Sequence, residues 1–485
     1  MYKKGDKIIG KIEKLVFGGA GVMRVDGGID GNGVARRLTV FVEGGAPGDE
    51  VEVEFFSLKR NLAMARIVKM IKPSEQRIEP RCKHFLKCGG CSWQFLSYQD
   101  QLKVKSEEVF ESLVRTGGID REALDAVWKP ILFMEDPWYY RNKMEFSFNR
   151  TVDYDEREQK IPGTWQIGLH MKGRYYDVCE IEECYLFRPW IGEFLNKVRE
   201  WLPTVAEFGG QFSSLIVRRG TGTGEVMINL LVENGELNFE QSFLKMVEEF
   251  FAVSGSEQDK LTSVFLTQII NIKGQRKEWR ETLLWGAPVF KEKLNLGNGR
   301  ILTFDVAPQA FLQPNTVQAE RFYALIRELA GLDQKTEPER QKKIFDLYCG
   351  TGTIGIALAD KAASVVGIEL NSPAVENARI NAEQNGVKNM EFIVGDVARV
   401  LPERGAEVDL VVVDPPRAGL HNSVIATIAA TRVARVIYVS CNPATLARDL
   451  KIFLAAGFTL EFVQPVDQFC HTYHVETVVL LSRAI

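Results

Sequence analysis

The stretch Ile-Phe-Asp-Leu-Tyr-Cys-Gly-Thr-Gly-Thr-Ile-Gly, residues 344–355, decides the fold of this chain. Its apolar start predicts a strand, and its glycines allow a tight turn into a helix whose free N–H groups face a ligand. A glycine pattern of this kind fits a dinucleotide as well as S-adenosylmethionine, and it also fits a turn that binds nothing. The surrounding sequence therefore has to distinguish these three interpretations.

Short β-branched runs alternate with helical segments from residue 343 to the C-terminus. This alternation predicts an α/β fold with a parallel sheet that is covered on both faces. The last two apolar runs, residues 458–466 and 476–483, are joined by a connection too short for a crossover helix, so we expect them to be antiparallel. A doubly wound sheet with a reversed final strand is the outline of a Rossmann-like methyltransferase domain, which we assign to residues 311–485.

Acidic residues end three consecutive predicted strands: Glu369, Asp396 and Asp414. Ligands of such sheets bind outside the carboxyl ends of the strands, so these side chains are expected to line one crevice. A ring of carboxylates repels a phosphate-rich cofactor and tolerates the cation S-adenosylmethionine. We expect Glu369 to accept hydrogen bonds from ribose hydroxyls and Asp396 to meet an adenine edge.

Cys441 lies in Tyr-Val-Ser-Cys-Asn-Pro, residues 438–443, where a buried strand ends and a helix begins. The N–H groups and the dipole of a helix N-terminus stabilise a thiolate, so Cys441 is a candidate nucleophile. Glu476 is a candidate base at the same level of the sheet, and either His471 or His474 is a candidate proton carrier or orienting group. The alternatives are a buried structural cysteine and an ordinary polar hairpin. Cys349 and Cys470 are expected to pack as small apolar side chains, and His421 to lie on the surface or cap a helix.

Three cysteines, Cys82, Cys88 and Cys91, lie within ten residues of one another. Clustered cysteines in a long chain that lacks the character of a secreted disulfide scaffold indicate a metal site. A fourth thiolate has to come from a distance, and Cys179 and Cys184 both qualify. Four thiolates suit zinc or an iron–sulfur cluster, and the spacing alone favours neither.

Residues 1–72 contain short apolar runs with Gly-rich breaks, which predicts a small OB-type β-barrel. This segment carries 13 Lys and Arg against 9 Asp and Glu, a mild basic bias in a chain of net charge −4. Residues 73–310 mix helical and strand-like pieces and are expected to form a central α+β domain. The aromatic and basic residues 139–143 and the arginine pair 218–219 are candidate nucleic-acid contacts.

The composition excludes several classes of protein. Apolar residues make up 45% and charged residues 26% of the chain, which excludes a largely disordered or fibrous protein. No uncharged apolar run approaches the roughly 18 residues that a membrane span needs, and the N-terminal sequence lacks the apolar core of a secretory signal. We therefore expect a cytoplasmic protein without a membrane partner.

Five motifs together closely resemble the RNA uracil-5-methyltransferase family. They are Phe-Leu-Gln-Pro-Asn (311–315), Asp-Leu-Tyr-Cys-Gly-Thr-Gly-Thr-Ile-Gly-Ile (346–356), Asp-Pro-Pro-Arg-Ala-Gly-Leu (414–420), Tyr-Val-Ser-Cys-Asn-Pro-Ala-Thr-Leu-Ala-Arg-Asp-Leu (438–450) and His-Thr-Tyr-His-Val-Glu (471–476). The resemblance covers nearly the whole chain. It implies an N-terminal barrel of the TRAM type, a central domain with an iron–sulfur cluster, and an S-adenosylmethionine domain.

The resemblance also implies roles for individual residues. Cys441 matches the nucleophile of the family and Glu476 matches the base that removes a proton. The positions that contact the cofactor match Gln313, Tyr348, Thr353, Glu369, Asp396 and Asp414. The ligands of a [4Fe–4S] cluster match Cys82, Cys88, Cys91 and Cys184.

The implied activity is the S-adenosylmethionine-dependent methylation of uridine at C5 in RNA, through a covalent bond between Cys441 and C6 of the base. Ribosomal RNA (23S) is the favoured partner, uridine 54 of transfer RNA is the alternative, and no DNA partner is expected. The cluster is expected to have a structural or RNA-orienting role. An NAD-dependent oxidoreductase uses the same glycine loop but leaves Cys441 and Glu476 unexplained. A non-catalytic iron–sulfur RNA-binding protein has no need of either residue.

Overall fold

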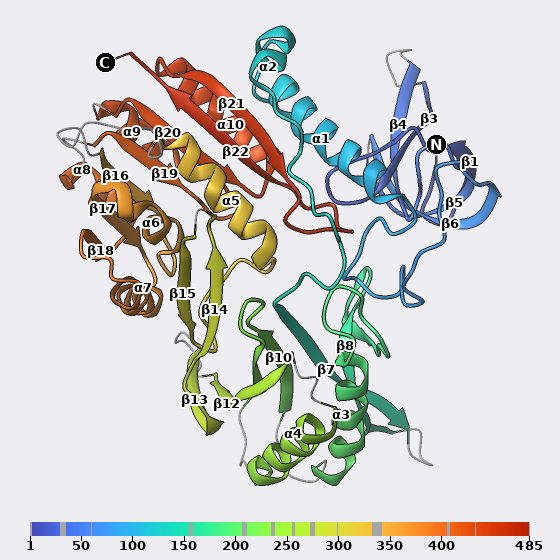
Figure 1. The fold of residues 1–485 in the computed structure, drawn as a ribbon. Coiled ribbons are helices and arrows are strands. Elements are labelled where there is room, and N and C mark those ends of the chain that lie inside the picture. The colour runs from blue at the N-terminus through green and yellow to red at the C-terminus, as the bar shows by residue number, and fades with distance from the viewer. Residues whose placement is uncertain are drawn as a thin grey trace.

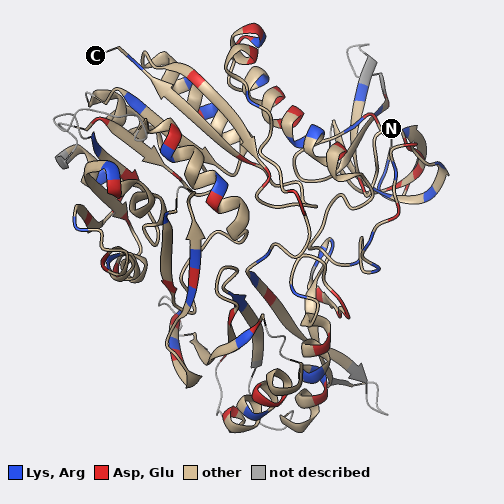
Figure 2. Cartoon of the chain, in the orientation of Figure 1, with Lys and Arg blue, Asp and Glu red and all other residues tan. Residues whose placement is uncertain are grey.

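The computed structural model contains three sheets of six or seven strands and one separate two-stranded hairpin (Figure 1). It describes residues 2–29, 35–59, 61–154, 159–205, 211–233, 238–254, 258–271, 277–297, 299–331, 342–404, 408–431 and 433–484. Lys and Arg are interspersed with Asp and Glu over the N-terminal, central and C-terminal sheets and the helices around them (Figure 2). None of these three parts shows side chains of only one sign of charge in Figure 2. No helix of these ranges is long and apolar enough to cross a membrane.

The C-terminal sheet has the predicted doubly wound topology. Its strands are β16 (Lys342–Leu347), β17 (Ala362–Glu369), β18 (Met390–Val394), β19 (Leu410–Val413), β20 (Arg435–Ser440), β21 (Thr459–Val466) and β22 (Glu476–Ser482). They lie in the order β18-β17-β16-β19-β20-β22-β21, in which the first five are parallel. β22 runs antiparallel to both β20 and β21, which confirms the prediction for the last pair of strands.

Helices cover both faces of this sheet. They are α5 (Thr316–Leu329), α6 (Thr353–Leu358), which a 3-10 turn η2 (Ala359–Lys361) extends, α7 (Ser372–Gln384), α8 (Val397–Arg404), α9 (Asn422–Ala430) and α10 (Pro443–Ala455). Phe322 of α5 and Ala378 of α7 belong to one buried cluster, and Ile425 of α9 and Leu450 of α10 belong to the other. Successive residues of β16 alternate between the two clusters, as expected for a strand that is buried on both faces.

Helix α1 (Tyr98–Arg115) begins where Ser97 caps its N-terminus and ends before Gly118, whose φ is +69°. The helix packs against α10, and its Val109 and Leu113 share a buried cluster with the C-terminal sheet, as does α2 (Arg121–Val127). The segment that joins the N-terminal sheet to the central sheet therefore contributes a helical layer to the C-terminal sheet.

The central sheet is mixed, with helices on one face. Its strands are β7 (Lys143–Tyr154), β8 (Lys160–Met171), β9 (Arg174–Cys179), β10 (Gln211–Arg219), β11 (Glu225–Glu233), β12 (Lys260–Ile270) and β13 (Glu278–Gly286), in the order β13-β12-β11-β10-β7-β8-β9. The helices α3 (Ile191–Val205) and α4 (Glu240–Ser254) pack on it through one aromatic-rich cluster. The hairpin of β14 (Phe290–Asn295) and β15 (Ile301–Val306) packs instead with α5 and the C-terminal sheet.

The N-terminal sheet contains β1 (Lys7–Lys11), β2 (Lys14–Leu15), β3 (Gly21–Ile29), β4 (Ala35–Glu43), β5 (Glu50–Lys59) and β6 (Leu62–Lys72). Val51, Val53 and Phe55 alternate into its core. The order β1-β5-β6-β4-β3-β2 leaves β1 and the two-residue β2 at the edges. Among the described residues these edges are not paired with each other, so the closed OB-type barrel expected for residues 1–72 is not confirmed.

Candidate active site

The carboxyl ends of the parallel strands bring together polar residues that are far apart in the sequence. Tyr348 follows β16, Glu369 ends β17, Asp396 follows β18, Asp414 follows β19 and Cys441 follows β20. Because the five strands are parallel neighbours, these residues lie along one edge of the sheet. The acidic strand ends therefore share this edge of the sheet with the glycine loop and Cys441.

Cys441 and Glu476 lie opposite each other across the β20–β22 pair. Ser440 at the end of β20 pairs with Thr477 of β22 in antiparallel register. The next residue along β20 is Cys441, and the preceding residue on β22 is Glu476, so the register brings the two to the same level. The sequence separates the thiol and the carboxyl by 35 positions, and only the reversed strand makes them neighbours.

The turn that carries Cys441 is held by hydrogen bonds around the start of α10. The side chain of Asn442 accepts from the backbone N–H of Ala444 at 3.1 Å and donates to the carbonyl of Arg417 at 3.1 Å. Pro443 occupies the first turn of the helix, where its missing N–H costs nothing. The half-buried thiol therefore has a fixed position at the end of β20.

The electrostatic surroundings of Cys441 differ from the simple helix-terminus expectation. Burial, and then the charges of Glu476 and Asp414, raise the pKa of the Cys441 thiol to about 11, and the guanidinium of Arg417 opposes this increase. Burial is the largest cause of this increase, so the position at a helix N-terminus does not bring the pKa of the thiol below its ordinary value. A positive charge bound nearby favours the thiolate.

Three carboxyl groups at this edge have pKa values that are raised to about 7 or 8. Burial, with a contribution from Asp414, raises the pKa of Glu476 to about 8. Burial raises the pKa of Asp414 to about 7, and burial together with the neighbouring Asp414 and Glu369 raises that of Asp346 to about 7. A crevice with this many poorly stabilised carboxylates suits a cationic ligand.

The glycine loop has the backbone conformation that its sequence predicts. Tyr348, Gly350 and Gly352 all have positive φ, at 63°, 53° and 78°. A Cβ atom on Gly352 would lie 2.9 Å from the ring of Phe392, so any larger residue there would displace that ring. The loop is thus a tight left-handed turn between β16 and α6.

Two acidic residues, Asp346 and Glu369, accept hydrogen bonds from backbone N–H groups of this loop. The buried Asp346 accepts a hydrogen bond from the N–H of Gly355 at 2.8 Å, and its second oxygen, Oδ1, has no partner. Glu369 accepts from the N–H of Gly350 at 3.2 Å and from that of Asn371 at 2.8 Å. Glu369 was expected from the sequence, whereas Asp346 was missed, although it stands in the quoted glycine motif.

The remaining predicted cofactor residues lie around the same edge. The side-chain oxygen of Gln313 accepts from Gln468 at 3.4 Å, in the segment between β15 and α5. Thr353 is the first residue of α6 and hydrogen-bonds the side chain of Tyr323. The carboxylate of Asp396 accepts from the N–H of Ala398 at 2.9 Å, at the start of α8.

The histidines near Glu476 have different surroundings. His471 is buried and stacks on Trp138 with ring centroids 3.7 Å apart, an arrangement that suits orientation rather than proton transfer. Nε2 of His474 lies 3.5 Å from a guanidinium nitrogen of Arg417. Burial, and then the charge of Arg417, lower the pKa of His474 to about 4. His421 caps the N-terminus of α9, as expected.

Arg417 is a second charged residue of this site, after Asp346, that the sequence analysis did not single out. Its charge lowers the pKa of both Cys441 and Glu476 against the burial that raises them. The signal was available, because Arg417 is the last residue of Asp-Pro-Pro-Arg, which follows the strand end at Asp414.

The cysteines outside the crevice separate into two groups. Cys349 and Cys470 are buried in hydrophobic clusters, as predicted. Cys82, Cys88 and Cys91 each have Cys184 among the charges that raise the pKa of their thiols, after burial, whereas Cys179 acts only on Cys88. Among the described residues, no group of three or more His, Cys, Asp or Glu side chains could hold a single metal ion.

A buried guanidinium faces this group of cysteines. Nε of Arg141 is buried and has no hydrogen-bond partner. Burial raises the pKa of Cys91 to about 12 and also raises that of Cys184, and the charge of Arg141 opposes both increases. Arg141 thus offsets part of the cost of a negative charge on these two thiols.

Most of the candidate nucleic-acid contacts in the central sheet are wrong. Tyr140 and Asn142 are buried. Arg218 is buried and donates to the carbonyls of Ala307 and Ala310, at 3.0 and 2.5 Å. Arg219 is likewise buried, in an ion pair with Asp259. The two arginines therefore bind groups inside the domain and do not lie on its surface.

The C-terminal part of the chain matches a family model described as a methyltransferase domain, over residues 338–453. Proteins named uncharacterized RNA methyltransferases are similar over nearly the full length. That of Clostridium tetani is 34% identical over 469 residues, covering 93% of both chains. That of Porphyromonas gingivalis is 36% identical and covers 94% of this chain and 98% of its own, and that of Caldanaerobacter subterraneus is 35% identical over 99% and 100%.

A solved structure is similar over the whole chain. The tRNA (uracil-54, C5)-methyltransferase of Pyrococcus abyssi, in complex with S-adenosyl-L-homocysteine, has a TM-score of 0.67 and 26% sequence identity. The similarity covers 98% of this chain and 100% of the other.

Proposed function

Because the chain belongs to the family of RNA methyltransferases, we propose that it transfers a methyl group from S-adenosylmethionine to C5 of a uridine in RNA. The observation that carries this proposal is the pairing of Cys441 with Glu476 across β20 and β22, at the edge that also holds the glycine loop. A methyltransferase that uses an already nucleophilic atom needs no such pair. The oxidoreductase alternative does not fit the family.

The residues of the crevice fit S-adenosylmethionine, which supplies an electrophilic methyl group on a positively charged sulfur. The raised pKa values of Asp414 and Asp346, at about 7, indicate a site that gains from a bound cation. Oδ1 of Asp346 is buried without a partner, and Glu369 stands at the end of the strand next to the glycine loop. We assign Gln313, Tyr348, Thr353, Glu369, Asp396 and Asp414 to the cofactor.

The chemistry needs a nucleophile because C5 of uracil is too weakly nucleophilic to attack a methyl sulfonium unaided. The Cys441 thiolate adds to C6, and the electron pair of the C5–C6 double bond moves through the ring to form an enolate. The enolate carbon C5 attacks the methyl group, the bond between that methyl carbon and the sulfonium sulfur breaks, and S-adenosylhomocysteine leaves with the electron pair. Glu476 then takes the C5 proton, the double bond re-forms, and the bond between sulfur and C6 breaks.

Positioning supplies much of the rate. Holding the thiol, the base and the methyl donor in line contributes up to about 7–11 kcal/mol to the lowering of the barrier. A stacked base does not expose C6 to a thiol, so the target nucleotide has to leave the stack, at a cost of a few kcal/mol. The half-buried position of Cys441 at the mouth of the crevice is compatible with a flipped base.

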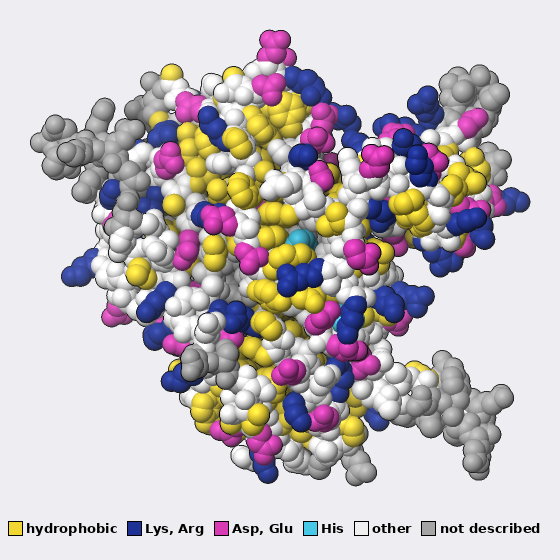
Figure 3. Space-filling view, turned by 45° about the vertical axis from the view of Figure 1, so that its right-hand side comes forward, with side chains coloured by type: hydrophobic (Ala, Val, Ile, Leu, Met, Phe, Trp, Pro, Cys, Tyr) yellow, Lys and Arg dark blue, Asp and Glu magenta, His cyan; other side chains and the backbone are white. Residues whose placement is uncertain are grey.

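Two classes of RNA are candidates. Ribosomal RNA is the partner that the resemblance of the sequence favours. Transfer RNA is supported by the similarity to the Pyrococcus abyssi enzyme, which acts on uracil 54 of tRNA. A hydrophobic surface with a His side chain and with both basic and acidic side chains around it occupies the middle of one face (Figure 3); its apolar part suits base stacking and its Lys and Arg side chains suit phosphate contacts.

Four cysteines, Cys82, Cys88, Cys91 and Cys184, fit an iron–sulfur cluster. Cys184 interacts with the other three, and the unpartnered Nε of Arg141 lies in a buried region whose charged neighbours include Cys91 and Cys184. An iron–sulfur cluster with four thiolate ligands carries negative charge and would supply the partner that the guanidinium of Arg141 lacks. We assign the cluster a structural role, in which it holds the segment around residues 82–101.

The test uses RNA that carries tritium at C5 of uridine. Purified protein with S-adenosylmethionine should release tritium to water in equal amount to the methyl groups transferred, because C5 loses its hydrogen when it gains the methyl group. Mass spectrometry of ribosomal and transfer RNA from a strain lacking the gene then shows which 5-methyluridine disappears. Methyl transfer without tritium release, or to another atom, would overturn the proposal.

A further inference from the structure

The loop of residues 467–475 joins β21 to β22 and ends immediately before Glu476. Its start is held by α1. Nζ of Lys105 lies 2.5 Å from Oδ1 of Asp467, and both side chains are fully buried. The same Nζ donates to the carbonyl of Phe469 at 3.0 Å, and the hydroxyl of Tyr98 donates to Oδ2 of Asp467 at 2.7 Å. An ion pair with both members buried and hydrogen-bonded fixes the position of the backbone that bears it.

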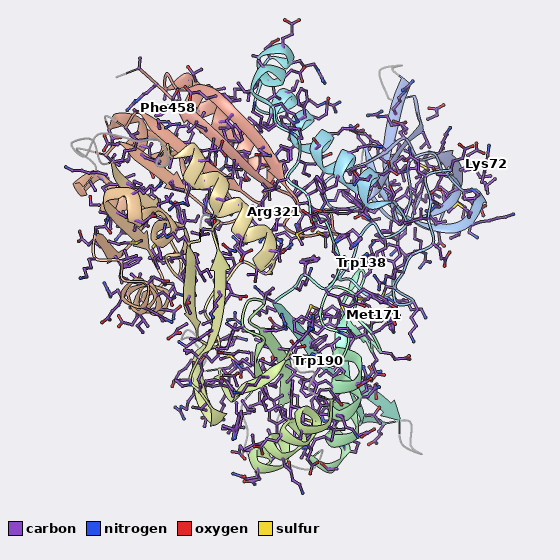
Figure 4. All side chains as sticks on the ribbon, viewed as in Figure 1. Lys72, Trp138, Met171, Trp190, Arg321 and Phe458 are labelled. Atoms are coloured by element: carbon purple, nitrogen blue, oxygen red, sulfur yellow. The ribbon has the colours of Figure 1, made fainter. Side chains whose placement is uncertain are left out.

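The middle of the loop is held at His471, which has a φ of +63°. Its carbonyl accepts from the N–H of Ser92 at 2.8 Å and from that of Trp93 at 3.3 Å. Its ring stacks on Trp138, and its Nδ1 lies 3.3 Å from Nε2 of Gln101. Trp138 lies where α1, the N-terminal sheet and the central sheet converge (Figure 4). A residue in the left-handed region persists only where its surroundings determine it.

The contacts at His471 belong to the cysteine-bearing segment. Ser92 directly follows Cys91, so the amide that holds the loop is bonded to the carbonyl carbon of a candidate cluster ligand. The loop also touches the cofactor side, because Nε2 of Gln468 donates to the carbonyl of Asn315 at 3.2 Å. One short loop therefore connects the cysteines, the cofactor segment and the residue that begins β22.

We propose that the loop 467–475 positions the Glu476 carboxylate and that the cysteine-bearing segment sets the shape of this loop. Lys105, Asp467 and His471 are its positioning residues. The inference rests on the proposed function, in which Glu476 removes the C5 proton after methyl transfer. A base that acts only in this last step has to be held in place while the thiol adds and the methyl group moves.

The experiment follows the covalent RNA adduct in single turnovers of the full-length protein with S-adenosylmethionine, resolved on denaturing gels. The double variant Lys105→Met with Asp467→Leu removes both charges, which avoids an unpaired buried ion. We expect methyl transfer to occur and the adduct to persist about 10²-fold longer than in the wild type, which is the size of effect that a small misplacement produces. Affinity for S-adenosylmethionine should change less than about twofold, within the usual scatter of distant substitutions.

Further variants keep the result interpretable. His471→Gly keeps the backbone conformation, which glycine adopts freely, and removes the stacking ring; it should also prolong the adduct. Cys91→Ser should speed hydrogen exchange of the amides in 467–475 without changing that of β16. Lys103→Met, on the exposed side of α1, is the matched control and should behave as wild type.

The outcomes separate the two proposals. If Glu476→Gln neither methylates RNA nor forms an adduct, the proposed function is wrong; if it methylates RNA without an adduct, Glu476 is not the base and the positioning role is wrong. If Glu476→Gln traps the adduct while the double variant and His471→Gly release it at the wild-type rate, the positioning role is wrong. Unchanged hydrogen exchange of 467–475 in Cys91→Ser overturns the link to the cysteines.

Discussion

The two groups of cysteines in this chain have different charged neighbours. At Cys441, burial and the carboxylates of Glu476 and Asp414 raise the pKa of the thiol, and Arg417 opposes the increase. At Cys91 and Cys184, burial also raises the pKa and the charge of Arg141 opposes it, while Glu183 adds to the increase at Cys184. The first site therefore has more carboxylates than arginines, whereas the charged neighbours of Arg141 in the second are Tyr140 and the two thiols.

This difference indicates what each region binds. Buried groups of one sign are costly unless an opposite charge is supplied. In the proposed function, a methyl sulfonium would supply the positive charge at Cys441, and the thiolates of an iron–sulfur cluster would supply the negative charge beside Arg141. The chemistry of the ligand can thus be inferred from the imbalance, even where no ligand is bound.

Removing the nucleophile should have the largest effect. Cys441→Ala should abolish methyl transfer, by about 10⁴-fold or more as for other nucleophiles that act within a unit, while binding of S-adenosylmethionine persists. Radiolabelled methyl transfer and a cofactor titration measure the two quantities. Cys179→Ala is the matched control, because Cys179 is a buried cysteine at the end of β9 in the central sheet; appreciable turnover by Cys441→Ala would refute the nucleophile.

Removing the base should have the next largest effect and a different signature. Glu476→Gln keeps the shape of the side chain and removes its capacity to take a proton, so turnover should decrease by about 10²–10⁴-fold. The methylated RNA should remain bonded to Cys441 and migrate with the protein on denaturing gels. Slow turnover without any trapped species would assign the proton to another group.

The second region makes a prediction for the iron content rather than for turnover. Cys184→Ser should lower the iron bound per protein and bleach the visible absorbance of the cluster, because it removes a thiolate that interacts with three others. Cys179→Ser is the matched control and should retain both. The reverse pattern would make Cys179 the fourth ligand, and iron loss in neither variant would argue against a cluster at these cysteines.

The sequence predicts the C-terminal sheet well because its signals are local. Strand-sized runs, the glycine loop and the acidic strand ends all follow from spacing along the chain, and the short link before Glu476 correctly indicates an antiparallel final pair. The pairing of Cys441 with Glu476 across β20 and β22 depends on the same feature. The roles of the two residues stay predictions.

Other parts of the structure depend on contacts that spacing does not encode. Arg218 and Arg219 lie in strand-like sequence that gives no sign of burial. In the structure both side chains are buried, Arg218 donating to backbone carbonyls and Arg219 pairing with Asp259. The ion pair of Lys105 with Asp467 joins residues that are 362 positions apart. Whether the N-terminal sheet closes into a barrel depends likewise on the pairing of its edge strands β1 and β2. The alternation of apolar residues along the sequence does not predict that pairing.

The smallest expected effect is a dependence of stability on pH that is specific to the first region. The pKa of Glu476 is raised to about 8, so the folded state favours the neutral acid. Its stabilising contribution is complete below the unfolded pKa near 4.5 and is lost as the pH rises through 8, at about 1.4 kcal/mol per pH unit. Between pH 6 and pH 8 the cofactor-free protein should therefore lose about 2–3 kcal/mol, seen as a decrease in the midpoint of thermal unfolding of several degrees.

Two comparisons assign that decrease to the crevice. Glu476→Gln has no proton to lose at this position, so its midpoint should change less between the two pH values. Saturating S-adenosylmethionine should reduce the decrease in the wild type, because a bound cation stabilises the ionised carboxylate. An equal decrease in both proteins, insensitive to the cofactor, would show that the carboxylates at the Cys441 edge do not carry the imbalance from which a cationic ligand is inferred.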